Sequence, residues 1–143
     1  MERMEDSRRK RYRQKLNELE DRLDFLEAHL AWKEEFIGNR VLRKACYKEF
    51  QEAVEIVSDL CAMITKDGNR FVEDDYTNLE FASKVVNLNE NDANRLKEAH
   101  GLRNVVVHEY NGIDDSLAFD SMLEILPSLK EFAKKVKKWL KSV

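Results

Sequence analysis

The sequence of residues 42–64, LRKACYKEFQEAVEIVSDLCAMI, decides the fold class. Its apolar residues recur in steps of three and four, the spacing that places side chains on one face of an α-helix. The positions concerned are Leu42, Cys46, Phe50, Ala53, Val57, Leu60 and Ile64. Asn39 before this stretch is a candidate N-cap, and Asp67-Gly68-Asn69 after it tolerates the positive φ that ends a helix. We therefore predict a long amphipathic helix from Asn39 to about Lys66.

A leucine stripe precedes this helix, and it predicts a second long helix over residues 7–36. The stripe alternates steps of three and four over about two heptads, while charged residues occupy the other faces. Its members are Leu16, Leu19, Leu23, Leu26 and Leu30. A stripe this short is more typical of a helix in an antiparallel bundle than of a parallel coiled coil.

Helical patterns also follow the central helix. Residues 69–77 are polar and are expected to form a loop, after which Thr77 and Glu80 have the spacing of a capping box. That box predicts a short helix to about residue 86. A longer helix is expected from about residues 89–92 to about Glu109, where Asn111-Gly112 breaks the pattern.

The last helix is expected to begin after Asp114 or Asp115, with a kink at Pro127. The chain of 143 residues contains four glycines and one proline. That scarcity argues against β-sandwiches and Rossmann-type folds, which depend on glycine and proline in their turns. The fold class predicted for residues 1–143 is therefore all-α: one domain, an antiparallel bundle of four long helices plus one short helix.

The cysteines and the apolar runs bear on the cellular compartment. Cys46 and Cys61 lie within one periodic stretch and lack the close spacing of a zinc or redox site. We expect them to be free core residues, as suits a reducing compartment. No apolar run approaches the about 18 residues that a membrane span requires. The chain is therefore expected to be cytoplasmic, with no membrane partner.

The net charge of -3 conceals a strongly uneven distribution. Residues 1–13 contain six basic and three acidic residues, and residues 127–143 contain six basic residues and one acidic residue. The intervening residues are acidic overall. The lysines near the C-terminus lie mostly opposite the apolar stripe of their helix, which favours a solvated face. If they flank the site described below, they would add salt-dependent attraction for a nucleic acid.

Histidines are the natural candidates for acid-base chemistry near neutral pH. His29 has no second ligand or base at a useful spacing, and His100 belongs to no metal-binding helical motif. We therefore predict no metal site.

The segment from Arg103 to Tyr110 is different, because it concentrates Arg103, Asn104, His108 and Tyr110 near a helix end. Helical spacing puts Asn104 and His108 on one face but separates Arg103 from His108 by about 140°. A two-fold dimer would bring both residue types into one cleft. The alternative is structural: Arg103 pairs with Glu109 or with an acid of a neighbouring helix, His108 caps the helix, and Tyr110 packs.

These residues carry a resemblance to a known family. Arg103-Asn104, His108 and Tyr110 match the R-x4-H-x-Y motif of HepT-like toxins, a branch of the HEPN superfamily of small helical proteins. The flanking Gly101-Leu102, the sequence Asn111-Gly112-Ile113-Asp114 and the stretch 40–55 are also similar to that family.

The resemblance implies a metal-independent endoribonuclease that acts as a homodimer without a cofactor. It implies that His108 is the general acid/base, Arg103 contacts the phosphate, and Asn104 orients the site. It also implies a cognate antitoxin of the minimal nucleotidyltransferase class, which silences the toxin by transferring AMP to Tyr110. The alternative is a non-catalytic HEPN module that binds a nucleotide or a protein.

Overall fold

The structure is a computed structural model, and it describes residues 3–143 except for the side chain of Tyr110. Every regular element in this part of the chain is helical. The elements are α1 (Asp6–His29), α2 (Lys33–Gly38), α3 (Arg40–Asp67), α4 (Asp75–Val85), α5 (Glu90–His108), the 3-10 turn η1 (Tyr110–Gly112) and α6 (Asp115–Ser142). The predicted all-α class is confirmed, but the described residues contain two short helices, α2 and α4, beside the four long ones, where one short helix was predicted.

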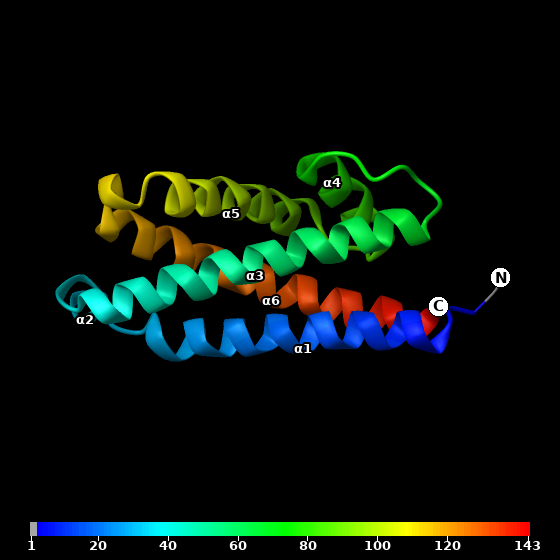
Figure 1. Cartoon of the computed structure of the whole chain (residues 1–143), viewed down its shortest axis with the longest axis horizontal. Helices are drawn as coiled ribbons and strands as arrows, with labels where there is room; N and C mark the ends of the chain where they lie inside the picture. Colours follow the sequence, from blue (N-terminus) through cyan, green and yellow to red (C-terminus); the bar gives the residue numbers. More distant parts are fainter. Residues whose placement is uncertain (1–2) are drawn as a thin grey trace.

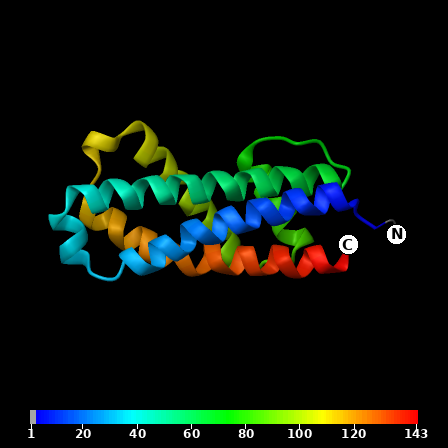
Figure 2. The ribbon, with the colours of Figure 1, turned by 60° about the horizontal axis from the view of Figure 1, so that its bottom comes forward.

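The long helices form an antiparallel bundle (Figure 1). α1 and α5 run in one direction, whereas α3 and α6 run in the other. α1 packs against α3 and α6, and α5 packs against the same two helices. The two chain ends lie together at one end of the bundle, and α2 lies at the other (Figure 2).

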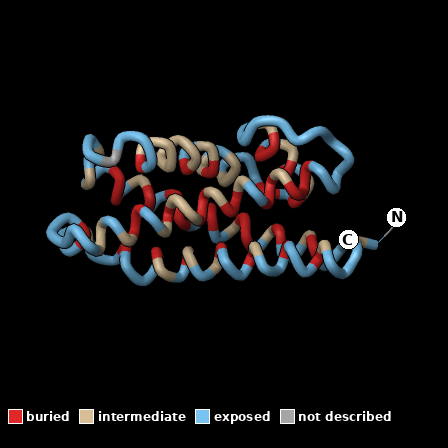
Figure 3. The backbone as a smooth tube through the Cα atoms, viewed as in Figure 1, coloured by how far each residue is buried: buried red, intermediate tan, exposed pale blue. Residues whose placement is uncertain are grey.

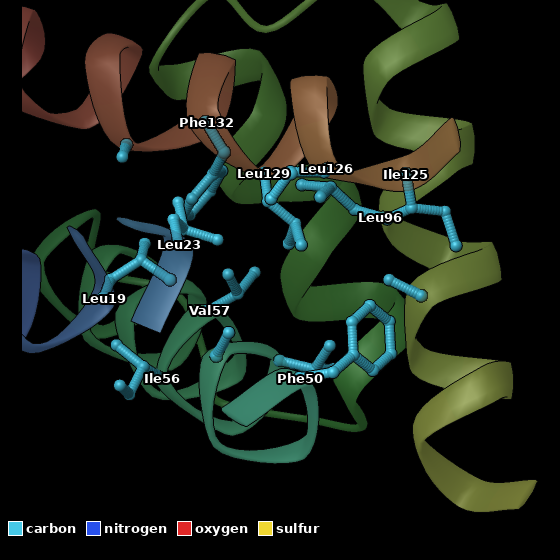
Figure 4. Packing of buried hydrophobic residues seen from close by; sticks show 14 of the residues in the cluster. Leu19, Leu23, Phe50, Ile56, Val57, Leu96, Ile125, Leu126, Leu129 and Phe132 are labelled. Atoms are coloured by element: carbon cyan, nitrogen blue, oxygen red, sulfur yellow. The ribbon is translucent and has the colours of Figure 1, made fainter. Parts of the chain in front are cut away.

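The core lies where these helices face one another, as Figure 3 shows by the buried segments along their inner sides. Phe50, Leu60, Leu129 and Phe132 are fully buried there. Side chains from α1, α3, α5 and α6 converge on this interior (Figure 4). Full burial of such a side chain contributes roughly 1.5–3 kcal/mol. The apolar positions predicted for α3 are all buried except Leu42, which packs against the core at its edge.

The prediction of one continuous helix over residues 7–36 is wrong. α1 ends at His29, and Trp32 has an extended backbone with φ of -127° and ψ of 107° before α2 begins. The break redirects the chain so that Phe36 is fully buried, with its ring centroid 5.6 Å from that of Tyr47 and 5.2 Å from that of Phe119. Tertiary burial of Phe36 thus overrides the local helical pattern.

Side-chain caps set several helix starts. Asn39 accepts a hydrogen bond from the Leu42 amide at 3.0 Å, so the predicted cap of α3 is confirmed. The amide of Asp92 donates to Asn89 at the start of α5. Of the two candidates for α6, Asp114 is the cap. Asn69, with φ of 59°, supplies the positive φ after α3.

The predicted capping box of Thr77 and Glu80 is wrong. The N-cap of α4 is Asp74, three residues earlier, and its side chain accepts the Thr77 amide at 2.8 Å. Aspartate is a stronger N-cap than threonine, which explains the shift. Glu80 instead accepts a hydrogen bond from Lys97 of α5 at 2.8 Å.

Cys46 and Cys61 are free and buried, as predicted. α6 continues as a helix through the exposed Pro127. None of the helices in the described part of the chain is long and apolar enough to cross a bilayer.

Candidate functional site

The candidate site lies on the last two turns of α5. Leu96, Ala99 and Val106 are the buried residues that fix this helix on the bundle. Glu109 ends α5, and the turn η1 leads into α6. The site therefore lies at the α2 end of the bundle, opposite the two termini (Figure 1).

Arg103 is held by two hydrogen bonds. Its Nη2 donates to Oε1 of Glu55 on α3 at 2.9 Å, and its Nη1 donates to Oδ1 of Asn104 at 3.1 Å. One quarter of the Arg103 side chain remains exposed. The structural alternative predicted that Arg103 pairs with Glu109 or with an acid of a neighbouring helix. Glu55 of α3 is that acid.

Glu55 is itself held in place by a second donor. Nε2 of Gln51, one turn earlier on α3, donates to the same Oε1 at 3.0 Å. Partial burial alone would raise the pKa of Glu55, but the hydrogen bonds from Arg103 and Gln51 outweigh it and lower that pKa. Glu55 is therefore ionised at neutral pH and compensates the charge of Arg103.

The guanidinium retains capacity for a further ligand. Each Nη of arginine carries two N–H groups, and the contacts with Glu55 and Asn104 use one on each. The Nε of Arg103 is buried and has no hydrogen-bond partner within the described residues. Arg103 can thus donate a hydrogen bond to a phosphate oxygen while it remains bound to Glu55.

His108 is exposed at the last residue of α5. Because α5 stays helical through this residue, the angular separation of about 140° between Arg103 and His108 persists. No hydrogen bond or ion pair joins the His108 ring to another side chain in the part that the structure describes. The structure therefore brings Arg103, Asn104 and Glu55 together, but leaves His108 apart from them.

Tyr110 begins the turn η1, two residues after His108. Its side chain lies outside the described residues, so the predicted modification site is located here by its backbone alone. The turn closes with a hydrogen bond from the Gly112 amide to the Glu109 carbonyl at 2.8 Å.

The other two histidines have local packing contacts. The His29 ring lies against Phe25, with 4.3 Å between ring centroids. Nε2 of His100 lies 3.4 Å from a carboxylate oxygen of Asp75, and its ring meets Tyr76 edge-on at 5.1 Å. No cluster of three or more His, Cys, Asp or Glu suited to a metal ion occurs among residues 3–143 as described.

The start of α6 is fixed close to the site by contacts with α3. Nε of Arg43 lies 3.5 Å from a carboxylate oxygen of Asp115, and the Tyr47 hydroxyl donates to the same carboxyl group. These contacts anchor the α6 side of the turn that follows His108.

Glu55 is the site residue that sequence reasoning missed. The only local signal is that this charged residue lies between two core residues, Val54 and Ile56, at the border of the packed face. Which partner meets it there depends on how α5 crosses α3, and spacing within one helix contains no information about that crossing.

The sequence of residues 14–136 matches the family model described as Ribonuclease HepT-like. This chain belongs to the HepT-like ribonuclease family. Two relatives of this HepT-like chain, both named "Putative RNase", come from Archaeoglobus fulgidus. One is 35% identical over 131 residues, covering 92% of this chain and 94% of the relative. The other is 36% identical over 91 residues, covering 64% of this chain and 69% of the relative.

A solved structure is similar to the HepT-like chain in fold. It is described as the tri-AMPylated Shewanella oneidensis HEPN toxin in complex with MNT antitoxin. The TM-score is 0.80, and the match covers 94% of this chain and 99% of that one. At 15% sequence identity, this likeness shows the shared HEPN fold alone.

Proposed function

We propose that this chain is a metal-independent endoribonuclease toxin that acts as a homodimer. The observation that carries the proposal is that Arg103, hydrogen-bonded to Asn104, and the exposed His108 lie on the last two turns of α5, in a chain of the HepT-like ribonuclease family. Arg103 binds the scissile phosphate and stabilises the charge that develops on it. Asn104 orients the guanidinium, and Glu55 positions it from α3.

The proposed reaction needs one base and one acid. His108 of one copy takes the proton of the ribose 2′-hydroxyl, whose oxygen attacks the adjacent phosphorus. The bond from phosphorus to the 5′-oxygen breaks, and a protonated histidine returns a proton to that oxygen. The products are a 2′,3′-cyclic phosphate and a 5′-hydroxyl.

The dimer supplies what one chain lacks. Within one chain the helical separation of about 140° keeps Arg103 and His108 from facing one point. A two-fold axis beside the end of α5 would place both motifs in one cleft, with two arginines and two histidines.

We also propose regulation at Tyr110 by a partner of the nucleotidyltransferase class. The solved structure described above is of an AMPylated HEPN toxin with an MNT antitoxin, which supports a partner of this kind. AMP attached two residues from His108 would place a bulky anion beside the phosphate-binding Arg103. That anion would repel an incoming RNA phosphate.

The test is cleavage of tRNA and mRNA by purified protein in EDTA, without any partner. The parent is expected to produce cyclic-phosphate ends, whereas Arg103→Ala and His108→Ala are not. His29→Ala is the matched control, because it removes an exposed histidine outside the motif. Equal cleavage by parent and motif variants would show that the activity has another source. Binding without cleavage by the parent would favour the non-catalytic module.

A further inference from the structure

A groove runs between the beginning of α1 and the end of α6, at the bundle end opposite the candidate site. Its volume is about 340 Å³. Its floor includes Leu16 and Leu140, and four cations line it: Arg9, Arg13, Lys137 and Lys141. We call these four residues, with their groove, the terminal basic groove. Figure 2 shows that α1 and α6 bring the two basic chain ends to this same end.

The four cations form two helical pairs, each with an i,i+4 spacing. Arg9 and Arg13 lie one turn apart on α1, and Lys137 and Lys141 lie one turn apart on α6. Each wall of the groove therefore carries two cations, and the two walls come from segments more than 120 residues apart in the chain.

Two of the four cations are already committed to the fold. The buried guanidinium of Arg9 donates to the carbonyls of Leu140 and Val143, which holds the end of α6 against α1. Lys137 pairs with Glu20. Arg13 and Lys141 are exposed, and neither has an ion pair or hydrogen bond within the described residues.

Some exposed cations elsewhere in the bundle are paired across helices. Lys33 bonds Asp120 at 2.9 Å, and Lys97 bonds Glu80 at 2.8 Å. Near the groove, Asp67 is occupied by Arg8 and by the Tyr12 hydroxyl. Glu20 pairs with Lys137, and Glu5 and Asp6 are exposed at the start of α1. Positive charge is in excess at the terminal end, because residues 1–13 contain six basic and three acidic residues and residues 127–143 contain six basic and one acidic residue.

We infer that the terminal basic groove binds the sugar-phosphate backbone of an RNA strand. The identification of the bound polyanion as RNA rests on the proposed function. The groove adds a second region of contact with the substrate, distant from the Arg103–His108 motif. Phosphate binding needs spaced cations and no base readout, so the contact is independent of RNA sequence.

The surface chemistry favours a polyanion over a membrane or a protein. In the described part of the chain, the exposed large apolar residues fall within positions 32–123 of the sequence, and none of them belongs to either wall of the groove. Membrane-surface helices and protein interfaces both depend on such apolar anchors. A phosphate backbone does not require them.

The groove and the motif are far enough apart to separate their effects. α6 begins beside the candidate site, and 26 residues of helix to Lys141 span about 40 Å. A stacked strand with about 3.4 Å between phosphates needs roughly 12 nucleotides to cover that length. A tetranucleotide cannot contact both ends of one chain.

The test compares two double variants in a His108→Ala background, which keeps the RNA intact. The groove variant is Arg13→Gln with Lys141→Gln. The control is Lys33→Gln with Lys97→Gln, which makes the same charge change at cations already paired with carboxylates. Binding of a fluorescent, unstructured RNA of about 30 nucleotides is measured by anisotropy at several salt concentrations. All four side chains lie at the surface, and unfolding midpoints check that each variant folds.

The groove variant is expected to bind more weakly and to reduce the slope of log K against log salt by about 1.4, which is two single-strand phosphate contacts. The control should keep the parental slope, and tetranucleotide binding should be equal in all three proteins. An unchanged slope in the groove variant overturns the inference, as does an equal fall in the control or a parent that does not bind RNA. The groove variant is also tested for binding of a polyglutamate peptide. If it keeps its RNA affinity but no longer binds the peptide, the groove binds an acidic protein partner and the inference is overturned.

Cleavage is measured separately with the His108-containing parent. Salt-dependent binding in the groove without cleavage would contradict the proposed nuclease and leave the groove assignment intact. If the parent cleaves RNA and the groove variant binds RNA as tightly as the parent, the groove assignment is contradicted and the proposed nuclease stands.

Discussion

The guanidinium of Arg103 and the carboxylate of Glu55 join the end of α5 to the middle of α3, with 2.9 Å between Nη2 and Oε1. The two residues are 48 positions apart in the chain. Gln51 fixes Glu55 from one turn away, so the position of Arg103 is set by α3 as much as by its own helix. This relationship makes Glu55 a positioning residue for the proposed phosphate contact.

Replacement of Glu55 tests that role. Glu55→Gln should lower the rate of RNA cleavage by about 10- to 100-fold, because a small displacement of a positioning group has effects of that size. Glu52→Gln is the matched control, since Glu52 lies on the same helix as Glu55 but forms its 2.9 Å ion pair with Arg22 of α1, away from the motif. Both variants should lose at most about 1 kcal/mol of unfolding free energy. Equal loss of activity in the two would assign Glu55 a purely structural role.

The same pair predicts a dependence of stability on pH. The pKa of Glu55 is lowered in the folded protein from its ordinary value of 4.5, so the folded state favours the ionised form. Its contribution is therefore present above pH 4.5 and is lost as the pH falls through the lowered pKa. The difference in urea midpoint between parent and Glu55→Gln should shrink as the pH falls below this range. A difference that grows at acid pH would contradict the assignment.

Mixing two inactive variants tests the shared cleft. Arg103→Ala and His108→Ala should each be inactive alone. Mixed dimers formed by co-expression hold one intact Arg103 and one intact His108, so cleavage should partly return. A mixture of His108→Ala with a second preparation of the same variant is the control. Light scattering that shows only a 16.9 kDa species would rule out the dimer itself.

The proposed modification predicts a change in mass. Incubation with a minimal nucleotidyltransferase and ATP should add AMP multiples to the parent chain and abolish its cleavage activity. Tyr110→Phe should retain its mass, since the acceptor oxygen is gone. Equal addition of AMP to Tyr110→Phe would assign the modification to a different residue.

The core predicts a large and local effect on stability. Leu129 is fully buried among the bundle helices, and Leu129→Ala should lower the unfolding free energy by about 2–5 kcal/mol. Leu117 on the same helix is 63% exposed, so Leu117→Ala should change it by no more than about 0.5 kcal/mol. Urea denaturation measures both. Similar losses at the two positions would contradict the burial pattern of α6.

Local periodicity was sufficient for most of the fold. The apolar steps of α3 and α6 predicted buried faces, and side chains such as Asn39 predicted where helices begin. It failed where tertiary contacts compete with local preference. α1 ends early because Phe36 gains more from burial between Tyr47 and Phe119 than from continuing the helix.

The sequence by itself determined the helical class, the long helices and the candidate residues Arg103, Asn104 and His108, because these depend on spacing within single segments. Only the tertiary structure decided that Glu55 holds Arg103 and that the basic ends of the chain meet across α1 and α6. Both are contacts between segments far apart in the chain, and they depend on how the helices cross. Spacing along one helix determines which face a residue occupies, but the packing of the bundle determines what that face meets.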